Sequence, residues 1–228
     1  MAAALSTSLA SKAYIVTGGF SGIGLATVNK LLQRSATIHA VGGADSPPSS
    51  LTCADLATTS SLGKVYFYPS IDVSSRAPVQ SAFKSILRLS PNISGLVNSA
   101  GICPFRGGIL EDDDTFHKII AVNLTGTWDG ATELHMQCSG LTRTWALDFA
   151  RYGIKVNLVA PGGTRSPLSA AQFDRAERGD MSRQVYPLIP MKRFAEPEEL
   201  LVDTIIHSLS DESSYITGRN LNVNGGWP

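Results

Sequence analysis

Residues 13–24 read AYIVTGGFSGIG, and this stretch decides the fold class. Its first part, AYIVTGG (13–19), is a short apolar run that ends in glycines, which predicts a buried strand. The turn after it opens a helix that carries Val28, Leu31 and Leu32 on one face. A strand, a glycine-rich turn and a helix in this order predict the first half of a strand–helix–strand unit with parallel strands.

The glycines of TGGFSGIG (17–24) have separate roles in such a turn. Gly18 allows the tight turn, Gly22 lets the backbone approach a pyrophosphate, and Gly24 permits close packing of the helix on the strand. The start of the helix is the positive end of its dipole and attracts a phosphate. We therefore predict a dinucleotide-binding turn, and the alternative is a turn of the same shape without a ligand.

The rest of the chain alternates apolar strands with helices. The predicted strands are 36–42, 64–72, 93–101, 154–163 and 218–227, and the predicted helices are 79–89, 112–128, 141–153 and 197–210. Such alternation indicates a parallel sheet that helices cover on both faces. We expect an α/β fold, a doubly wound parallel sheet, in a single domain over residues 1–228.

The alternation fails once, in the stretch GTWDGATELHMQCSGLTRTW (126–145). Between Asn123 and Leu141 no apolar or β-branched run is long enough for a strand. Because predicted helices flank this stretch on both sides, we expect that one interior strand of the sheet is missing.

Composition excludes several classes of function. Lys plus Arg equals Asp plus Glu at 19 each, so charge gives no reason to expect nucleic acid or an anionic membrane as partner. The three cysteines are an odd number and form no CxxC, so we expect no disulfide framework, no metal site and a reducing, cytoplasmic location. No apolar run approaches the ~18 residues of a membrane span, and the N-terminus lacks the features of a secretory signal.

The spacing Thr-Gly-x3-Gly-x-Gly in residues 17–24 resembles the glycine motif of the short-chain dehydrogenase/reductase family. Further landmarks of that family follow in order and extend the resemblance over nearly the whole chain. They are Asp72-Val73, Asn98-Ser99-Ala100-Gly101, Asn123 within AVNLTG, Pro161-Gly162 with Thr164, and the C-terminal segment 213–227. The resemblance implies a Rossmann-like domain that binds NADP(H) or NAD(H), in which a hydride passes between the cofactor and a small alcohol or ketone.

The resemblance also implies a role for each matched position. Asp72-Val73 would contact the adenine, the turn at 98–101 would lie under the cofactor, and Pro161-Gly162 with Thr164 would hold the nicotinamide amide. Asn123 matches the helical asparagine of the family and is the candidate catalytic residue. The candidate cofactor-binding residues are Gly18, Ser21, Gly22, Ile23, Gly24, Asp72, Val73, Asn98, Ala100, Gly101, Pro161, Gly162 and Thr164. The implied partners are a small-molecule substrate and, because family members commonly dimerise, a second copy of the chain.

The end of the predicted second strand bears on the choice of dinucleotide. An acidic residue there binds the ribose 2′-hydroxyl of NAD and disfavours the 2′-phosphate of NADP. This chain has Gly42 or Gly43 at that position, and Asp45 comes slightly later. The missing carboxylate favours NADP(H), although the glycine turn has no Lys or Arg to pair with a phosphate, so NAD(H) remains the alternative.

The family protonates its substrate with a tyrosine whose pKa is lowered by a lysine four residues later, and a serine orients the substrate oxygen. No tyrosine here has lysine at i+4; the six are Tyr14, Tyr66, Tyr68, Tyr152, Tyr186 and Tyr215. If the family pattern is counted back from LTRTWALDFARYG (141–153), the tyrosine falls at Ala131 and the lysine at His135. If it is counted forward from Asn123, the same residues belong to the preceding helix. We therefore expect that the segment with the serine and the Tyr-x3-Lys is absent.

Two interpretations of the function stay open at this point. The chain is a short-chain oxidoreductase in which His135, Ser139 or Cys138 replaces a lost group, although each is also explained as a packed or solvated side chain. Alternatively it is a catalytically inactive, dinucleotide-binding pseudoenzyme, or the product of a skipped exon.

Overall fold

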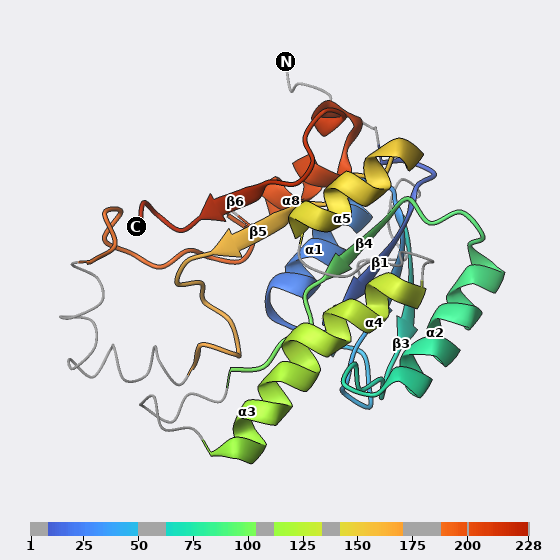
Figure 1. Ribbon diagram of the computed structural model, residues 1–228, viewed down its shortest axis with the longest axis horizontal. Coiled ribbons are helices and arrows are strands. Elements are labelled where there is room, and N and C mark those ends of the chain that lie inside the picture. Colours follow the sequence, from blue (N-terminus) through green and yellow to red (C-terminus); the bar gives the residue numbers. More distant parts are fainter. Residues whose placement is uncertain are drawn as a thin grey trace. The chain divides into compact units, whose positions relative to one another are not determined.

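A computed structural model describes residues 9–49, 63–103, 112–133, 142–170, 188–199 and 201–227. The chain forms two compact units, an N-terminal unit (Met1–Gln137) and a C-terminal unit (Cys138–Pro228), whose helices and strands are labelled in Figure 1. The expectation of a single domain over the whole chain stays a prediction.

The N-terminal unit is built on a four-stranded sheet. Its strands are β1 (Ala13–Thr17), β2 (Thr37–Val41), β3 (Lys64–Tyr68) and β4 (Gly95–Asn98). All neighbouring strands pair in parallel, in the order β3-β2-β1-β4. This order and direction confirm the predicted parallel sheet, and β1 at its centre is buried along its whole length.

Helices cover both faces of this sheet (Figure 1). Helix α1 (Gly22–Gln33) lies over one face, on the side of the Ala40 side chain of β2. Gly19 is next to both Ala40 and Val28 of α1, since a Cβ on Gly19 would be 3.1 Å from Ala40 Cβ and 3.3 Å from Val28 Cγ2. Val41, the next residue of β2, points to the opposite face and packs with helix α2 (Arg76–Leu89).

The predicted helix 112–128 is longer and less regular than expected. It consists of α3 (Asp113–Ile119), the π-helix η2 (Ile120–Thr125) and α4 (Gly126–Glu133). The Asp112 side chain caps α3 by accepting a hydrogen bond from the Thr115 N–H.

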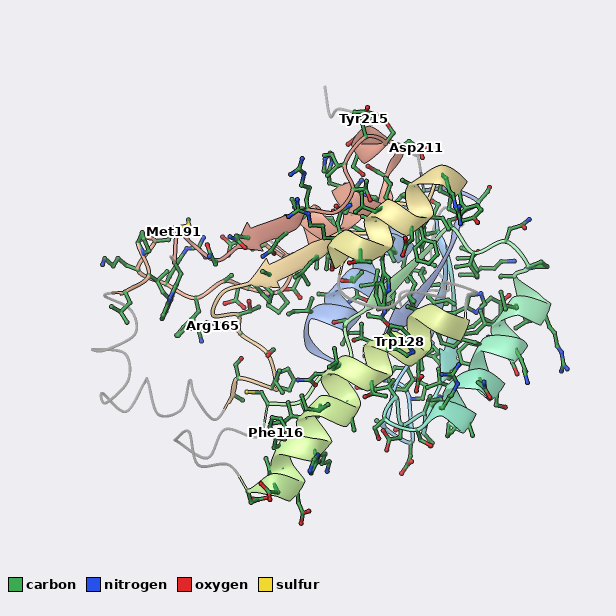
Figure 2. All side chains as sticks on the ribbon, in the orientation of Figure 1. Phe116, Trp128, Arg165, Met191, Asp211 and Tyr215 are labelled. Atoms are coloured by element: carbon green, nitrogen blue, oxygen red, sulfur yellow. The ribbon has the colours of Figure 1, made fainter. Side chains whose placement is uncertain are left out.

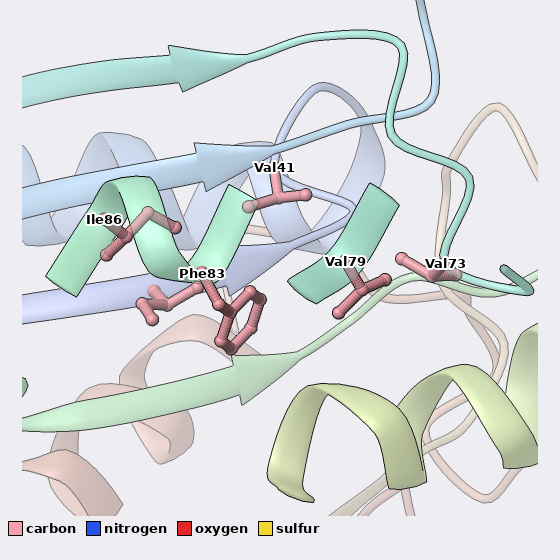
Figure 3. Close-up of a cluster of buried hydrophobic side chains, with 6 residues drawn as sticks. Val41, Val73, Val79, Phe83 and Ile86 are labelled. Carbon is pink, nitrogen blue, oxygen red and sulfur yellow. The ribbon is translucent and has the colours of Figure 1, made fainter. Parts of the chain in front are cut away.

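The core on the α2 face contains a cluster of buried apolar side chains (Figure 3). Its members are Ile15, Val41, Val73, Val79, Phe83 and Ile86. The α2 positions among them recur at helical spacing, so one face of the helix is buried against β1 and β2. Burial of each such side chain contributes about 1.5–3 kcal/mol.

One polar group is fully buried on the same face. His39 of β2 has Nδ1 3.1 Å from the Tyr68 hydroxyl and Nε2 2.9 Å from Ser90 Oγ. Its ring also stacks on Tyr66, with the centroids 5.2 Å apart. Burial lowers the pKa of His39 from 6.5 to about 4, because the charged form loses its hydration.

The C-terminal unit holds a two-stranded parallel sheet of β5 (Leu158–Pro161) and β6 (Asn220–Val223). Its described helices include α5 (Thr142–Phe149), the 3₁₀ turn η3 (Ala150–Tyr152), α8 (Leu201–Leu209) and the 3₁₀ turn η5 (Asp211–Ser213). Gly153 ends η3 in the left-handed conformation, with φ 73°, as glycine commonly does at a helix C-terminus. In the described part of the chain, no helix is both long and apolar enough to cross a membrane.

The buried histidine predicts a pH dependence of stability. Because the unfolded state binds a proton near pH 6.5 and the folded state only near pH 4, stability is full above about pH 6.5 and falls as the pH drops towards 4. Between about pH 7.5 and 5 we expect His39 to account for roughly 2 kcal/mol of lost unfolding free energy. Urea denaturation should show a shallower pH dependence for His39→Gln, whereas exposed His117→Gln should retain the wild-type slope; equal slopes for all three would contradict this account.

Candidate cofactor-binding site

The glycine turn after β1 packs too closely for any other residue. Gly18 has φ +67°, and a Cβ there would lie 2.7 Å from the Ala100 nitrogen. A Cβ on Gly24 would lie 2.2 Å from the Gly18 carbonyl oxygen. The turn is thus pressed against the residues that follow β4 on one side and against α1 on the other. The turn is therefore tight at Gly18 and closely packed at Gly24.

The start of α1 presents backbone donors. Ser21 is an exposed N-cap with extended backbone whose side chain makes no capping hydrogen bond, and the first turn contains no acidic residue. The first helical bond runs from the Leu25 N–H to the Ser21 carbonyl, at 3.0 Å. The N–H groups of Gly22, Ile23 and Gly24 therefore belong to the helix end that carries partial positive charge. This geometry suits an anion such as a pyrophosphate.

The turn after β4 is tied to β1 by a threonine. Thr17 Oγ1 accepts hydrogen bonds from the N–H groups of Ser99 and Ala100, at 3.3 and 3.4 Å, and donates one to Asn98 Oδ1, at 3.4 Å. The Asn98 amide donates to the Thr127 carbonyl, at 3.4 Å. The predicted residues Asn98 and Ala100 are thereby held beside Gly18 at the carboxyl end of the sheet.

Asn123 fixes the backbone that follows this turn. Its Oδ1 accepts from the Ile102 N–H at 2.8 Å, and its Nδ2 donates to the Ile102 carbonyl at 2.9 Å. A Cβ on Gly101 would lie 3.4 Å from the same Oδ1. Asn123 belongs to the π-helix η2, and such segments occur frequently at functional sites. Both the oxygen and the nitrogen of its side-chain amide bind the Ile102 backbone, so Asn123 holds the segment that follows the turn in place.

Asp72 and Val73 follow β3 and differ in exposure. The exposed Asp72 carboxylate accepts from the Ser74 N–H at 2.9 Å and from Ser74 Oγ at 2.7 Å, whereas Val73 is buried in the α2 cluster. Nearby, the Asp45 carboxylate accepts a hydrogen bond from Ser70 Oγ at 2.9 Å. All these residues lie at the carboxyl ends of parallel strands, where α/β sheets bind their ligands.

In the C-terminal unit, the loop after β5 is also closely packed. The Gly162 N–H donates to the Val223 carbonyl at 2.9 Å, and a Cβ on Gly162 would lie 2.7 Å from Asn224 Cα. The buried Thr164 donates from Oγ1 to the Gly162 carbonyl at 3.1 Å. A small pocket is lined by this loop and by the ends of neighbouring segments, among them Met191 (Figure 2).

The described tyrosines offer no counterpart of the Tyr-x3-Lys arrangement. Tyr68 contacts His39, Tyr152 is exposed beside Arg151, and Tyr215 is fully exposed (Figure 2). Lys155 donates from Nζ to the Ser210 carbonyl and to Ser213 Oγ, both at 2.7 Å, so it stabilises the end of α8. The candidates His135, Cys138 and Ser139 lie outside the described residues, as does Tyr186. Within the described ranges, no group of three or more His, Cys, Asp or Glu side chains could hold a metal ion.

Comparison with known proteins identifies the class of protein. A family model described as short chain dehydrogenase matches residues 12–138, and a model described as Enoyl-(Acyl carrier protein) reductase matches residues 135–228. The first match alone covers more than half of the chain. The chain therefore belongs to the short-chain dehydrogenase/reductase family, a family of oxidoreductases that typically bind NAD or NADP.

Individual relatives match over nearly the full length. The short chain dehydrogenase/reductase astE of Aspergillus oryzae is 30% identical, over 96% of this chain and 95% of that protein. The 3-oxoacyl-acyl-carrier-protein reductase of Thermotoga maritima is 28% identical, over 96% of this chain and 98% of the relative. Among solved structures, levodione reductase matches with a TM-score of 0.84 at 23% identity, over 96% of this chain and 98% of that chain. This last likeness confirms the Rossmann-like α/β fold.

The packing of the turn predicts the effect of a single added methyl group. Gly24→Ala would place its Cβ against the Gly18 carbonyl, and we expect it to lower the unfolding free energy by about 2 kcal/mol or more. At Gly43 a Cβ would meet only the Ile71 carbonyl oxygen, at 3.8 Å, so Gly43→Ala should stay within about 0.5 kcal/mol of wild type. Urea denaturation measures both, and equal stabilities of the two variants would show that the turn is looser than described.

Proposed function

We propose that the chain is an oxidoreductase that binds NADP(H), with NAD(H) as the alternative cofactor, and transfers a hydride between it and a small alcohol or ketone. The observation that carries the proposal is the glycine turn packed against the start of α1. A side chain at Gly18 or Gly24 would clash with the chain's own backbone, so glycine keeps the turn close to the start of α1, and this helix end supplies donors for a pyrophosphate.

The remaining matched residues are assigned by the family resemblance. Asp72 and Val73 would bind the adenine end, and Asn98, Ala100 and Gly101 would lie under the cofactor. In the C-terminal unit, Pro161, Gly162 and Thr164 would hold the nicotinamide amide. When bound, the nicotinamide ring supplies the hydride, and this chain's own residues bind and orient it. The absence of a carboxylate at Gly42 and Gly43 supports NADP(H) over NAD(H).

A charge placed at the start of α1 tests cofactor binding. Ser21→Asp retains a good N-cap, so the helix should form, but its carboxylate would repel a pyrophosphate. We expect NADPH and NADH to bind at least about tenfold more weakly to this variant, because like charges in contact cost several kcal/mol. Tryptophan fluorescence titration measures both Kd values, with the neutral N-cap variant Ser21→Asn as control. Equal affinities of the two variants would place the pyrophosphate elsewhere.

A second candidate function is an inactive, dinucleotide-binding pseudoenzyme or the product of a skipped exon. It is favoured by the lack of a tyrosine with lysine at i+4 in the sequence. Two further observations support a lost segment. The two family models meet at residues 135–138, where the chain also divides into its two units. The alignment with the Thermotoga reductase runs over 251 positions, more than the 228 residues of this chain.

Turnover separates the two candidates. If the chain is an oxidoreductase, NADPH oxidation with a panel of small ketones and aldehydes should exceed the rate without protein, and Ser21→Asp should lose this activity as it loses the cofactor. NADPH binding without turnover on any substrate would favour the pseudoenzyme. A longer transcript that encodes a Tyr-x3-Lys between Met136 and Leu141 would identify the skipped-exon product.

A further inference from the structure

Phe20, in the middle of the glycine turn, lies directly over Gly42 at the end of β2. A Cβ on Gly42 would be 2.4 Å from Phe20 Cγ, 2.5 Å from Cδ2 and 2.8 Å from Cδ1. The phenyl ring therefore occupies the space into which a side chain at position 42 would extend. The ring is half-buried, and it meets Phe67 of β3 edge to face, with the centroids 5.8 Å apart.

The ring, and not the backbone, requires glycine at this position. Gly42 is not among the residues with positive φ, so its conformation is open to any amino acid. Its backbone is held by two hydrogen bonds of 3.0 Å, from its N–H to the Tyr68 carbonyl and from the Ile71 N–H to its own carbonyl. The backbone at position 42 is thus anchored on both sides, and relief of a clash there would fall on the Phe20 ring.

Gly42 and Gly43, directly after β2, are the two positions at which a carboxylate would bind the ribose 2′-hydroxyl of NAD. The residue at the end of the second strand faces the ribose 2′ position, and a carboxylate there selects NAD over NADP. Asp45, three residues later, is bound to Ser70 Oγ. A Cβ on Gly43 would meet only the Ile71 carbonyl oxygen, at an ordinary contact distance of 3.8 Å, so the two glycines at this strand end differ in what they could accommodate.

We propose that Phe20 is a specificity-determining residue. Its ring takes the place of a side chain at position 42, forms an apolar wall beside the ribose 2′ position, and prevents a carboxylate at position 42 from reaching the ribose. This inference rests on the proposed dinucleotide binding and adds to it a residue that leaves the ribose 2′ position open to both NADP(H) and NAD(H). An apolar wall contacts the ribose of either cofactor, but it provides no charge that would reject a 2′-phosphate.

A double-mutant cycle between positions 20 and 42 tests the assignment. In Gly42→Asp the new side chain and the ring compete for one space, so we expect the Tm to fall by roughly 3–10 °C. We expect the ratio of Kd for NADPH to Kd for NADH to change by less than about twofold in this variant. In Phe20→Ala/Gly42→Asp the Tm should return to that of Phe20→Ala, and the ratio should rise at least about tenfold over it, because the carboxylate now reaches the ribose.

Two further variants serve as controls. Gly42→Ala tests the clash without adding a charge, and Gly43→Asp adds the charge without the clash, so the test does not depend on a single variant that fails to fold. Gly42→Ala should lower the Tm in the wild-type background and leave it unchanged beside Phe20→Ala. Gly43→Asp carries the same charge one residue later, where a Cβ meets nothing closer than 3.8 Å, and it should keep the wild-type Tm.

The outcomes separate this inference from the function on which it rests. Wild-type Tm for Gly42→Ala and Gly42→Asp, with the full change of cofactor preference in the single variant, would overturn the role of Phe20 while NADPH binding stands. The role of Phe20 would also be overturned if removing its ring in the double variants did not reduce the loss of Tm that each Gly42 substitution causes on its own. Failure of the wild-type chain to bind either NADPH or NADH would overturn the proposed function, and this inference with it.

Discussion

The contact between the glycine turn and its neighbours is the constraint on which the candidate site depends. Gly18 lies against the Ala100 backbone, and Gly24 lies against the Gly18 carbonyl, so three elements meet with no side chain between them. Thr17 adds hydrogen bonds to the backbone after β4. This packing brings the end of β1, the end of β4 and the first turn of α1 to one place. The N–H groups of that turn can face an anion only while this packing holds.

Because this part of the site is made of backbone and glycine, the sequence predicted it well. Three glycines at fixed spacing after an apolar run specify the turn, and the parallel sheet follows from alternating strands and helices. The boundaries were less predictable. The predicted strands 93–101 and 154–163 shrink to β4 and β5, since hydrogen bonding and not apolarity ends a strand. The predicted helix 112–128 runs on to Glu133.

Features that depend on tertiary contacts could not be predicted from the sequence. Nothing local indicates that Phe20 lies over Gly42, because the two residues meet only when β1 and β2 pair. His39 is one residue in an apolar run, and its partners Tyr68 and Ser90 come from distant parts of the chain. The π-helix at Asn123 has no compositional signature, although the double hydrogen bond to Ile102 fixes where its amide lies. Each of these features is decided by packing between elements.

The glycine turn of the proposed cofactor site lies on elements of the N-terminal unit that are separate from the segment expected to hold a proton donor. The N-terminal unit buries its α2 cluster between β1, β2 and α2, and β1 and β2 lie in the interior of the described four-stranded sheet. Within the described residues β4 pairs with β1 alone, so in a parallel ladder its alternate residues, Gly95 and Val97, direct their backbone groups away from the sheet. A further strand would satisfy these groups, each of which costs about 1–3 kcal/mol if buried and unpaired. Loss of such a strand would therefore weaken the edge of the sheet and remove side chains it carried, while the glycine turn at the centre keeps its packing. The proposed dinucleotide site would therefore be retained even if the segment with the proposed proton donor were lost.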